Sequence, residues 1–362
     1  MGRFKYIPEW EKIKERYRAF WECEIVDRCC INITARKDGT EHILPPSLPE
    51  AVGDRWTDLD YIKASNLYKL ETTFFGGETI PSMNGGFCGV DFVAVHMGCP
   101  IELSEETGWF TPIIQDGALT DYPIADYYVR EDSPWWQFSK RLHMHSLETA
   151  QGLCTAGIQA IGGCGDTLAA LRGTKELLTD LIECPDYVRA FDYQMYLQWK
   201  YEFEWAYELQ KEYNEGTLCG WFSLWSPGKF YPLQNDFSFM ISPKMFRDIF
   251  MPNIVEQAQY LDHTVYHVDG EGAFSHVDAL LEVPKIQCIQ ILPGPGASPL
   301  DYLGLLKRVQ GAGHGLCISL NPEDVERALE LLSAKGLIIY TQCKSETQAR
   351  YILDNIGKWT KE

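Results

Sequence analysis

Two stretches of the sequence carry residues that can bind a metal ion at the end of an apolar run. The stretch HTVYHVDGEG contains His267, Asp269 and Glu271, and the stretch LIIYTQC ends on Cys343. Side chains two apart on a strand point to the same face, so His267 and Asp269 can share a ligand. The Cys343 thiolate would complete an N/O/S set with an open fourth position, as catalytic zinc requires, so the spacing predicts a zinc site of these three residues. Glu271 is expected beside it as an alternate ligand or a catalytic base.

The same residues also have a simpler interpretation. The pair Asp269-Gly270 is typical of turns, and a polar strand end of this kind is often only a hydrogen-bonded loop. A cysteine such as Cys343 is commonly a small buried side chain rather than a ligand. Both interpretations stay open at the level of the sequence.

The aromatic stretch WFSLW offers candidates for a substrate site. Trp221 and Trp225 follow an apolar run and precede Ser-Pro-Gly, so we expect them at the end of a strand, where they would contact an apolar or cationic substrate. Aromatic clusters under a loop are also common packing elements, and that alternative stays open for both tryptophans.

Helices and strands alternate along the regions that must position these residues. Apolar side chains at helical spacing predict an amphipathic helix within 1–28, and the run CCINI at 29–33 predicts a first strand. Further along we expect strands at 155–161, 217–223, 263–268, 286–291, 315–319 and 337–341, and helices at 134–152, 166–183, 186–213, 242–261, 272–281, 299–310, from 321, and at 345–358.

Such alternation requires a parallel sheet with helical crossovers. Seven or eight strands of it favour a closed (β/α)8 TIM barrel, an α/β fold, formed by a single domain over 1–362. Prolines and glycines interrupt the region 45–132, which we expect to be an irregular insertion over the barrel mouth. No G-x-G-x-x-G motif follows a strand, so dinucleotide binding has no support.

Composition excludes several classes of function. The net charge of −19 and the pI near 4.9 disfavour binding to nucleic acid or to an anionic membrane. The first residues lack the apolar core of a signal peptide, which predicts a cytoplasmic protein. The twelve cysteines form no C-x-x-C pair, so we expect reduced, mostly buried thiols.

Several segments resemble the uroporphyrinogen decarboxylase superfamily, in particular its zinc-dependent, corrinoid-linked methyltransferases. The segment MISPKMFRDIFMPNIVEQAQYLDHTVYHVDGEG resembles the helix and strand that carry His-x-Cys-Gly in those enzymes; His267 matches the histidine and Asp269 replaces the cysteine. The segment LIIYTQCKSETQARYILDNI resembles the last strand and helix, whose zinc-binding cysteine falls on Cys343. CISLNPEDVERAL and GCGDTLAALRGTKELLTDLIECPDYV resemble further family segments, and the likeness covers 155 to the end.

The resemblance implies a mechanism and additional site residues. Zinc in this group lowers the pKa of an acceptor thiol, and the thiolate attacks a methyl group on a corrinoid (cobalamin) held by a partner protein. A carboxylate at Asp269 is a harder ligand than a thiolate, which leaves the acceptor open. By resemblance, Asp236 lies near the pocket as a catalytic residue and Asp166 contacts substrate; each can equally be a helix cap or a hydrogen-bond acceptor in a loop, and that alternative stays open. The related cobalamin-independent methionine synthase has a glutamate ligand on the next strand, and the comparable strand here, IQCIQIL, offers Gln290 and Cys288. Gln290 is a poor metal ligand, and we expect it to bind substrate.

The decarboxylase side of the superfamily fits less well. Arg16 and Arg18 do not form its arginine-rich segment, and we expect them on the solvated face of the opening helix. Two further hypotheses are a metal-free lyase acting on a small carboxylated substrate and a non-catalytic barrel that holds a ligand. The partners we expect are a small-molecule methyl donor or acceptor, a corrinoid protein and, in a homodimer, a second copy of the chain.

Overall fold

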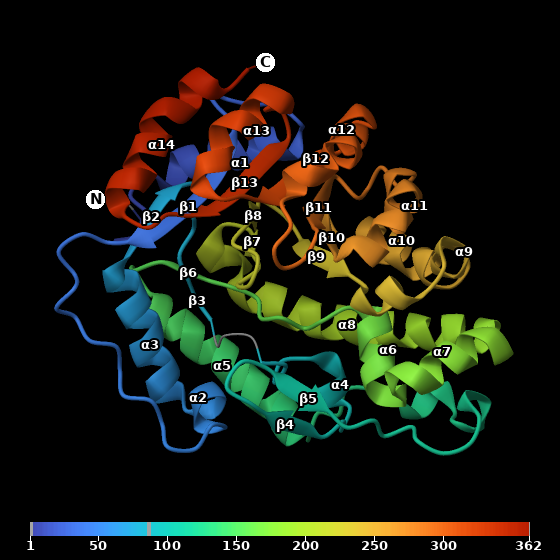
Figure 1. Ribbon diagram of the computed structural model, residues 1–362. Helices are drawn as coiled ribbons and strands as arrows, with labels where there is room; N and C mark the ends of the chain where they lie inside the picture. The colour runs from blue at the N-terminus through green and yellow to red at the C-terminus, as the bar shows by residue number, and fades with distance from the viewer. Residues whose placement is uncertain (1–2, 85–87, 362) are drawn as a thin grey trace.

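The computed structural model describes residues 3–84 and 88–361 and has an α/β architecture (Figure 1). Its strands are β1 (Cys30–Arg36), β2 (Thr73–Gly77), β3 (Ser82–Met83), β4 (Ile101–Leu103), β5 (Gly108–Phe110), β6 (Thr155–Ala156), β7 (Thr217–Leu218), β8 (Trp225–Ser226), β9 (Phe230–Gln234), β10 (His263–Asp269), β11 (Cys288–Leu292), β12 (Gly315–Ser319) and β13 (Leu337–Gln342). Its α-helices are α1 (Trp10–Trp21), α2 (Asp54–Thr57), α3 (Leu59–Thr72), α4 (Val93–His96), α5 (Pro134–Ala150), α6 (Cys164–Arg172), α7 (Thr174–Glu183), α8 (Pro185–Asn214), α9 (Pro243–Met245), α10 (Met251–Tyr260), α11 (Val277–Leu281), α12 (Leu303–Gly311), α13 (Val325–Leu331) and α14 (Glu346–Trp359).

The central sheet has seven strands in the order β2-β1-β13-β12-β11-β10-β9. Every neighbouring pair runs parallel except β1 and β2, and the first long strand pairs with the last. The described ladder ends at β2 and β9. Beyond it, the short pair β3–β6 and the bridge Ile158↔Cys219 add further parallel contacts. This arrangement is consistent with a TIM-barrel-like fold, although the described ladder does not close.

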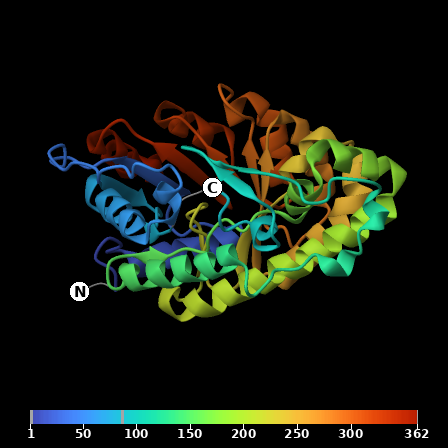
Figure 2. The same ribbon diagram turned by 90° about the horizontal axis from the view of Figure 1, so that it is seen from below.

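The strands β10 to β13 carry apolar residues on both faces because helices cover one face and the opposite face packs inside the protein. Their burial patterns are almost continuous. Figures 1 and 2 show α10 to α14 outside the C-terminal half of the sheet and the long helices α5 and α8 side by side. None of the described helices is long and apolar enough to cross a membrane.

The opening helix is confirmed, but the expectation that Arg16 lies on its solvated face is wrong. Arg16 is only 5% exposed, and its Nη1 lies 2.9 Å from Oε1 of the fully buried Glu78. Arg28 pairs with the same carboxylate at 2.8 Å. A buried charge is stable only when it is paired, so Glu78 holds both guanidinium groups inside the fold.

The region 45–132 contains more regular structure than its proline and glycine content predicts. It includes the fourteen-residue helix α3, and β2 within it joins the central sheet. Gly77 has a φ of 64°, and a Cβ there would lie 2.1 Å from the carbonyl oxygen of Ile31. Gly77 is therefore required by the close approach of two strands, and it also lies in the turn in which the Thr79 N–H donates to the carbonyl of Gly76 at 3.2 Å. That this region covers the mouth stays a prediction.

Two strands are shorter than predicted, and one strand was not predicted. β6 and β7 are two residues long, where 155–161 and 217–223 were expected. The strand β9 was missed because Pro232 lies within it and a proline argues against a strand in a sheet. In the structure β9 pairs only with β10, so the missing N–H of Pro232 is tolerated at an edge of the ladder.

Candidate metal centre

The strand register brings three potential metal ligands together. His267 of β10 pairs with Gln234, the last residue of β9. Asp269 and Asp236 each follow two residues later, and Asp236 is the first residue of the turn after β9. Residues at even spacing on neighbouring parallel strands project from the same face. The carboxyl end of the sheet therefore collects Asp236, His267 and Asp269 on one side.

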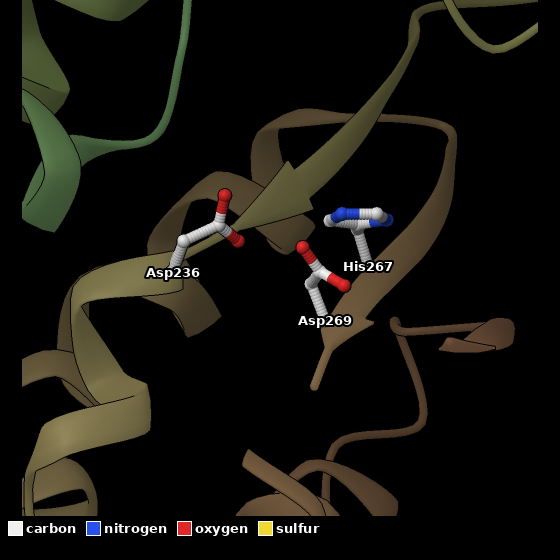
Figure 3. Close-up of side chains that lie close together, drawn as sticks. All are labelled: Asp236, His267 and Asp269. Atoms are coloured by element: carbon white, nitrogen blue, oxygen red, sulfur yellow. The ribbon is translucent and has the colours of Figure 1, made fainter. Parts of the chain in front are cut away.

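These three residues form a cluster with the donor set of a metal site. One ligand atom from each of Asp236, His267 and Asp269 lies within 4.8 Å of the other two. Figure 3 shows the two carboxylates facing each other beside the imidazole. Two oxygens and one nitrogen suit zinc and several other divalent metals. The predicted pair of His267 and Asp269 is thus brought together, and Asp236 joins it.

Gln290 orients the imidazole of His267. The paired position of β11 places its side chain next to His267, and its Oε1 hydrogen-bonds to Nδ1 of the ring. The amide also hydrogen-bonds to the Cys317 thiol. An amide oxygen only accepts, so Nδ1 donates this hydrogen bond, and Nε2 is the ring nitrogen left for a metal. Such a partner is what orients a metal-binding histidine. The structure thus gives Gln290 a contact with His267, whereas its predicted substrate contact stays a prediction.

Three carboxylates, of Asp166, Asp236 and Asp269, gather at the cluster. Burial, reinforced by the carboxylates of Asp166 and Asp269, raises the pKa of Asp236 to about 8 even though this side chain keeps some solvent exposure. Burial also raises the pKa of Asp166. Within the described part of the chain, no lysine or arginine is among the groups that shift either pKa. A bound cation would relieve this repulsion.

Asp166 supports the cluster from α6. Its Oδ1 accepts the backbone N–H of Phe237 at 2.9 Å, and the Gln234 amide donates to both Asp166 and Asp236 at 3.3 Å. Asp166 therefore holds the start of the turn that carries Asp236. Its predicted contact with substrate stays a prediction.

The glycines after Asp269 serve packing. Cβ atoms at Gly270 and Gly272 would lie 2.9 Å and 2.7 Å from the ring of Phe239, and Gly270 has a φ of 79°. Glu271, between them, is exposed and hydrogen-bonds to Tyr302, which raises the tyrosine pKa. Glu271 does not belong to the three-residue cluster, and its catalytic role stays a prediction.

The two candidate tryptophans lie in different environments. The ring of Trp221 packs edge-on against the His267 imidazole with 5.6 Å between centroids. Trp225 is fully buried, packs on Trp10, and donates its indole N–H to the carbonyl of Asn214 at 3.0 Å. The prediction that Trp225 contacts substrate is therefore not supported, because packing and its hydrogen bond use the whole side chain. Trp221 is next to the cluster.

Cys343 is not part of the cluster. It follows β13, which β12 and β11 separate from β10 in the sheet. Its side chain is 5% exposed, its N–H donates to the carbonyl of Thr34 at 2.7 Å, and burial raises its pKa to about 11. The predicted set of His267, Asp269 and Cys343 does not come together in this structure, because β10 and β13 are not adjacent.

A cavity of about 760 Å³ lies at the carboxyl ends of β1, β12 and β13. Residues 221–223 connect the wall of this cavity to the cluster through two hydrogen bonds and one ring contact. The Tyr340 hydroxyl donates to the carbonyl of Phe222 at 2.7 Å, and the Asn32 amide donates to that of Ser223 at 2.9 Å. Trp221, at the start of the same segment, contacts His267. Residues 221–223 therefore contact both the cavity wall and the cluster.

Sequence reasoning assigned Asp236 to catalysis rather than to the ligand set, and it did not consider Gln234. The sequence does contain a pattern that points to this pair: Gln234 and Asp236 have the same two-residue spacing as His267 and Asp269. That spacing indicates a shared face only if 230–234 is a strand, which the sequence does not predict.

Comparisons with known proteins give a fold-level likeness. No protein-family model matches the sequence, and no curated protein matches it. A solved structure of a methyltransferase from Methanosarcina mazei superposes with a TM-score of 0.62 at 13% identity, covering 92% of this chain and 93% of that one. At this identity, the chain shares the fold of that methyltransferase over nearly its whole length.

Proposed function

We propose that this chain is a metal-dependent methyltransferase that moves a methyl group between a corrinoid and a small acceptor. Zinc is the metal we favour, held by Asp236, His267 and Asp269. We further propose that the curved sheet is the wall of a (β/α)8 barrel. The observation that carries the proposal is the three-residue cluster at the carboxyl end of the sheet, where barrel enzymes have their active sites.

The residues present fit a divalent cation. Their carboxylate and imidazole donors are within reach of one another, Gln290 hydrogen-bonds to Nδ1 of His267 and leaves Nε2 available to a metal, and the Asp166 carboxylate lies close enough to raise the pKa of Asp236. This donor set replaces the one expected from the sequence, with Asp236 in the place of Cys343.

A metal bound there would supply Lewis acidity that lowers the pKa of an acceptor thiol or hydroxyl. The protein residues have separate tasks. Gln290 orients the imidazole, and Gln234 orients the Asp236 carboxylate. Trp221 covers one side of His267 and limits the access of water.

The fold-level likeness to the Methanosarcina methyltransferase supports this class of reaction, as does the resemblance of 155 to the end to corrinoid-linked enzymes. The lyase hypothesis has less support, because the cavity lining among the described residues contains no lysine or arginine that would anchor a carboxylated substrate.

The first test is the metal content of protein purified without chelator, measured by inductively coupled plasma mass spectrometry. We expect about one zinc per chain, as in other sites of this type, and a large loss in Asp236→Asn and His267→Gln. Asp354→Asn, an exposed aspartate on α14, is the matched control and should retain the metal.

The second test is transfer of the methyl group of methylcobalamin to a panel of thiol and pterin acceptors, followed by the absorbance of the corrinoid. Activity should depend on the metal and disappear in both site variants. Wild-type protein that binds no divalent metal, or methyl transfer that is unchanged in His267→Gln, would contradict the proposal.

A further inference from the structure

The cavity and the metal cluster lie on the same face of the central sheet. The register pairs His267 with Gln290 and Gln290 with Cys317. Two residues beyond Cys317 on the same strand, Ser319 pairs with Tyr340, and Tyr340 pairs with Asn32. Residues at one level of a ladder share a face. A molecule in the cavity would therefore occupy the same side of the sheet as the proposed metal.

The lining of the cavity is polar but nearly uncharged. Asp301 is the one charged side chain among its described residues, and its carboxylate already accepts the backbone N–H of Ser298 at 3.0 Å. An anionic ligand would meet no cationic partner there, and the chain as a whole has a net charge of −19. The cavity is therefore poorly suited to a carboxylate or a phosphate.

Some polar side chains of the cavity already have hydrogen-bond partners in the protein, and others are available to a ligand. Asn32 and Tyr340 are occupied by their hydrogen bonds to residues 221–223. Ser319, Asn321 and Gln342 line the cavity with exposed side chains that make no hydrogen bond to other described residues. Hydroxyl and amide groups both donate and accept, so they complement ligand hydroxyls, which do the same.

We propose that the cavity binds a neutral polyhydroxylated molecule, a sugar or a polyol, through Ser319, Asn321 and Gln342. The volume of about 760 Å³ is within the range of small-molecule sites. If the bound molecule is the methyl donor or acceptor, this inference rests on the proposed function. The binding itself uses no metal.

The test is isothermal titration calorimetry on the full chain in the presence of EDTA. The neutral probes are methyl α-D-glucopyranoside, myo-inositol and D-sorbitol, and the charged probes are D-gluconate, D-glucose 6-phosphate and D-glucosamine. We expect at least one neutral probe to bind, and to bind more tightly than every charged probe. The double variant Ser319→Ala/Gln342→Leu removes two binding groups and should weaken binding about tenfold. Gln259→Leu, an exposed glutamine on α10, is the matched control and should leave binding unchanged.

Three results would overturn the inference: no binding of any neutral probe, tighter binding of a charged probe, or equal affinity in the double variant and the wild type. Circular dichroism of each variant separates lost binding from lost folding. Because EDTA removes the metal, failure of the metal site leaves this measurement intact. Conversely, metal content measured without any sugar tests the proposed function alone.

Discussion

Replacing Asp192 by asparagine should change how the stability of the protein depends on pH. Asp192 lies on α8, is 1% exposed, and accepts a hydrogen bond from the Asn253 amide at 2.5 Å. Its second carboxylate oxygen has no hydrogen-bond partner among the described residues. Burial is the main cause that raises its pKa from 3.8 to about 7, and the nearby Asp166 adds to the effect.

The raised pKa gives the direction and size of the effect. The folded protein favours the protonated acid, so this stabilisation is fully present below about pH 4 and is lost as the pH rises toward 7. A pKa of about 7 in the folded state against 3.8 in the unfolded chain corresponds to about 4 kcal/mol, as an upper value. Asparagine stays neutral and has nearly the same shape.

The assay is urea unfolding of wild type and Asp192→Asn, followed by circular dichroism at about pH 4 and about pH 8. Relative to wild type, the variant should gain up to about 4 kcal/mol in free energy of unfolding between the two conditions. Asp354→Asn, exposed on α14, should follow the wild type throughout. Parallel pH profiles for wild type and Asp192→Asn would refute the reasoning, because they would mean that Asp192 ionises normally inside the fold.

Three further predictions concern the cluster and its supports. Gln290→Leu should lower zinc affinity about 10- to 100-fold in a competition titration, since the imidazole loses its orienting partner; unchanged affinity would remove Gln290 from the site. Cys343→Ser should keep the zinc content of the wild type, because this thiol lies outside the cluster; loss of zinc would restore the ligand set expected from the sequence. Gly270→Ala should destabilise the fold by about 1–3 kcal/mol in urea unfolding, because its φ of 79° and the ring of Phe239 both oppose a Cβ, and an unchanged midpoint would contradict this.

The order of most elements could be predicted from local pattern. The alternation of buried apolar runs with amphipathic helices indicated β10 to β13 and the helices that follow them, because period and capping are local properties of the chain. The strand β9 could not be predicted in this way, because Pro232 interrupts the apolar pattern of 230–234. A proline is acceptable there only because β9 lies at an edge of the ladder.

The candidate site divides in the same way. His267 and Asp269 were found from sequence because their two-residue spacing on one strand already fixes them to a common face. The third member was decided by tertiary structure. Pairing of β9 with β10 brings the turn that carries Asp236 beside His267 and Asp269, whereas two intervening strands separate β10 from the strand that precedes Cys343. Spacing along one strand determines which of its side chains share a face. The distance between two strands depends instead on the order of the strands in the sheet, which is set by tertiary structure.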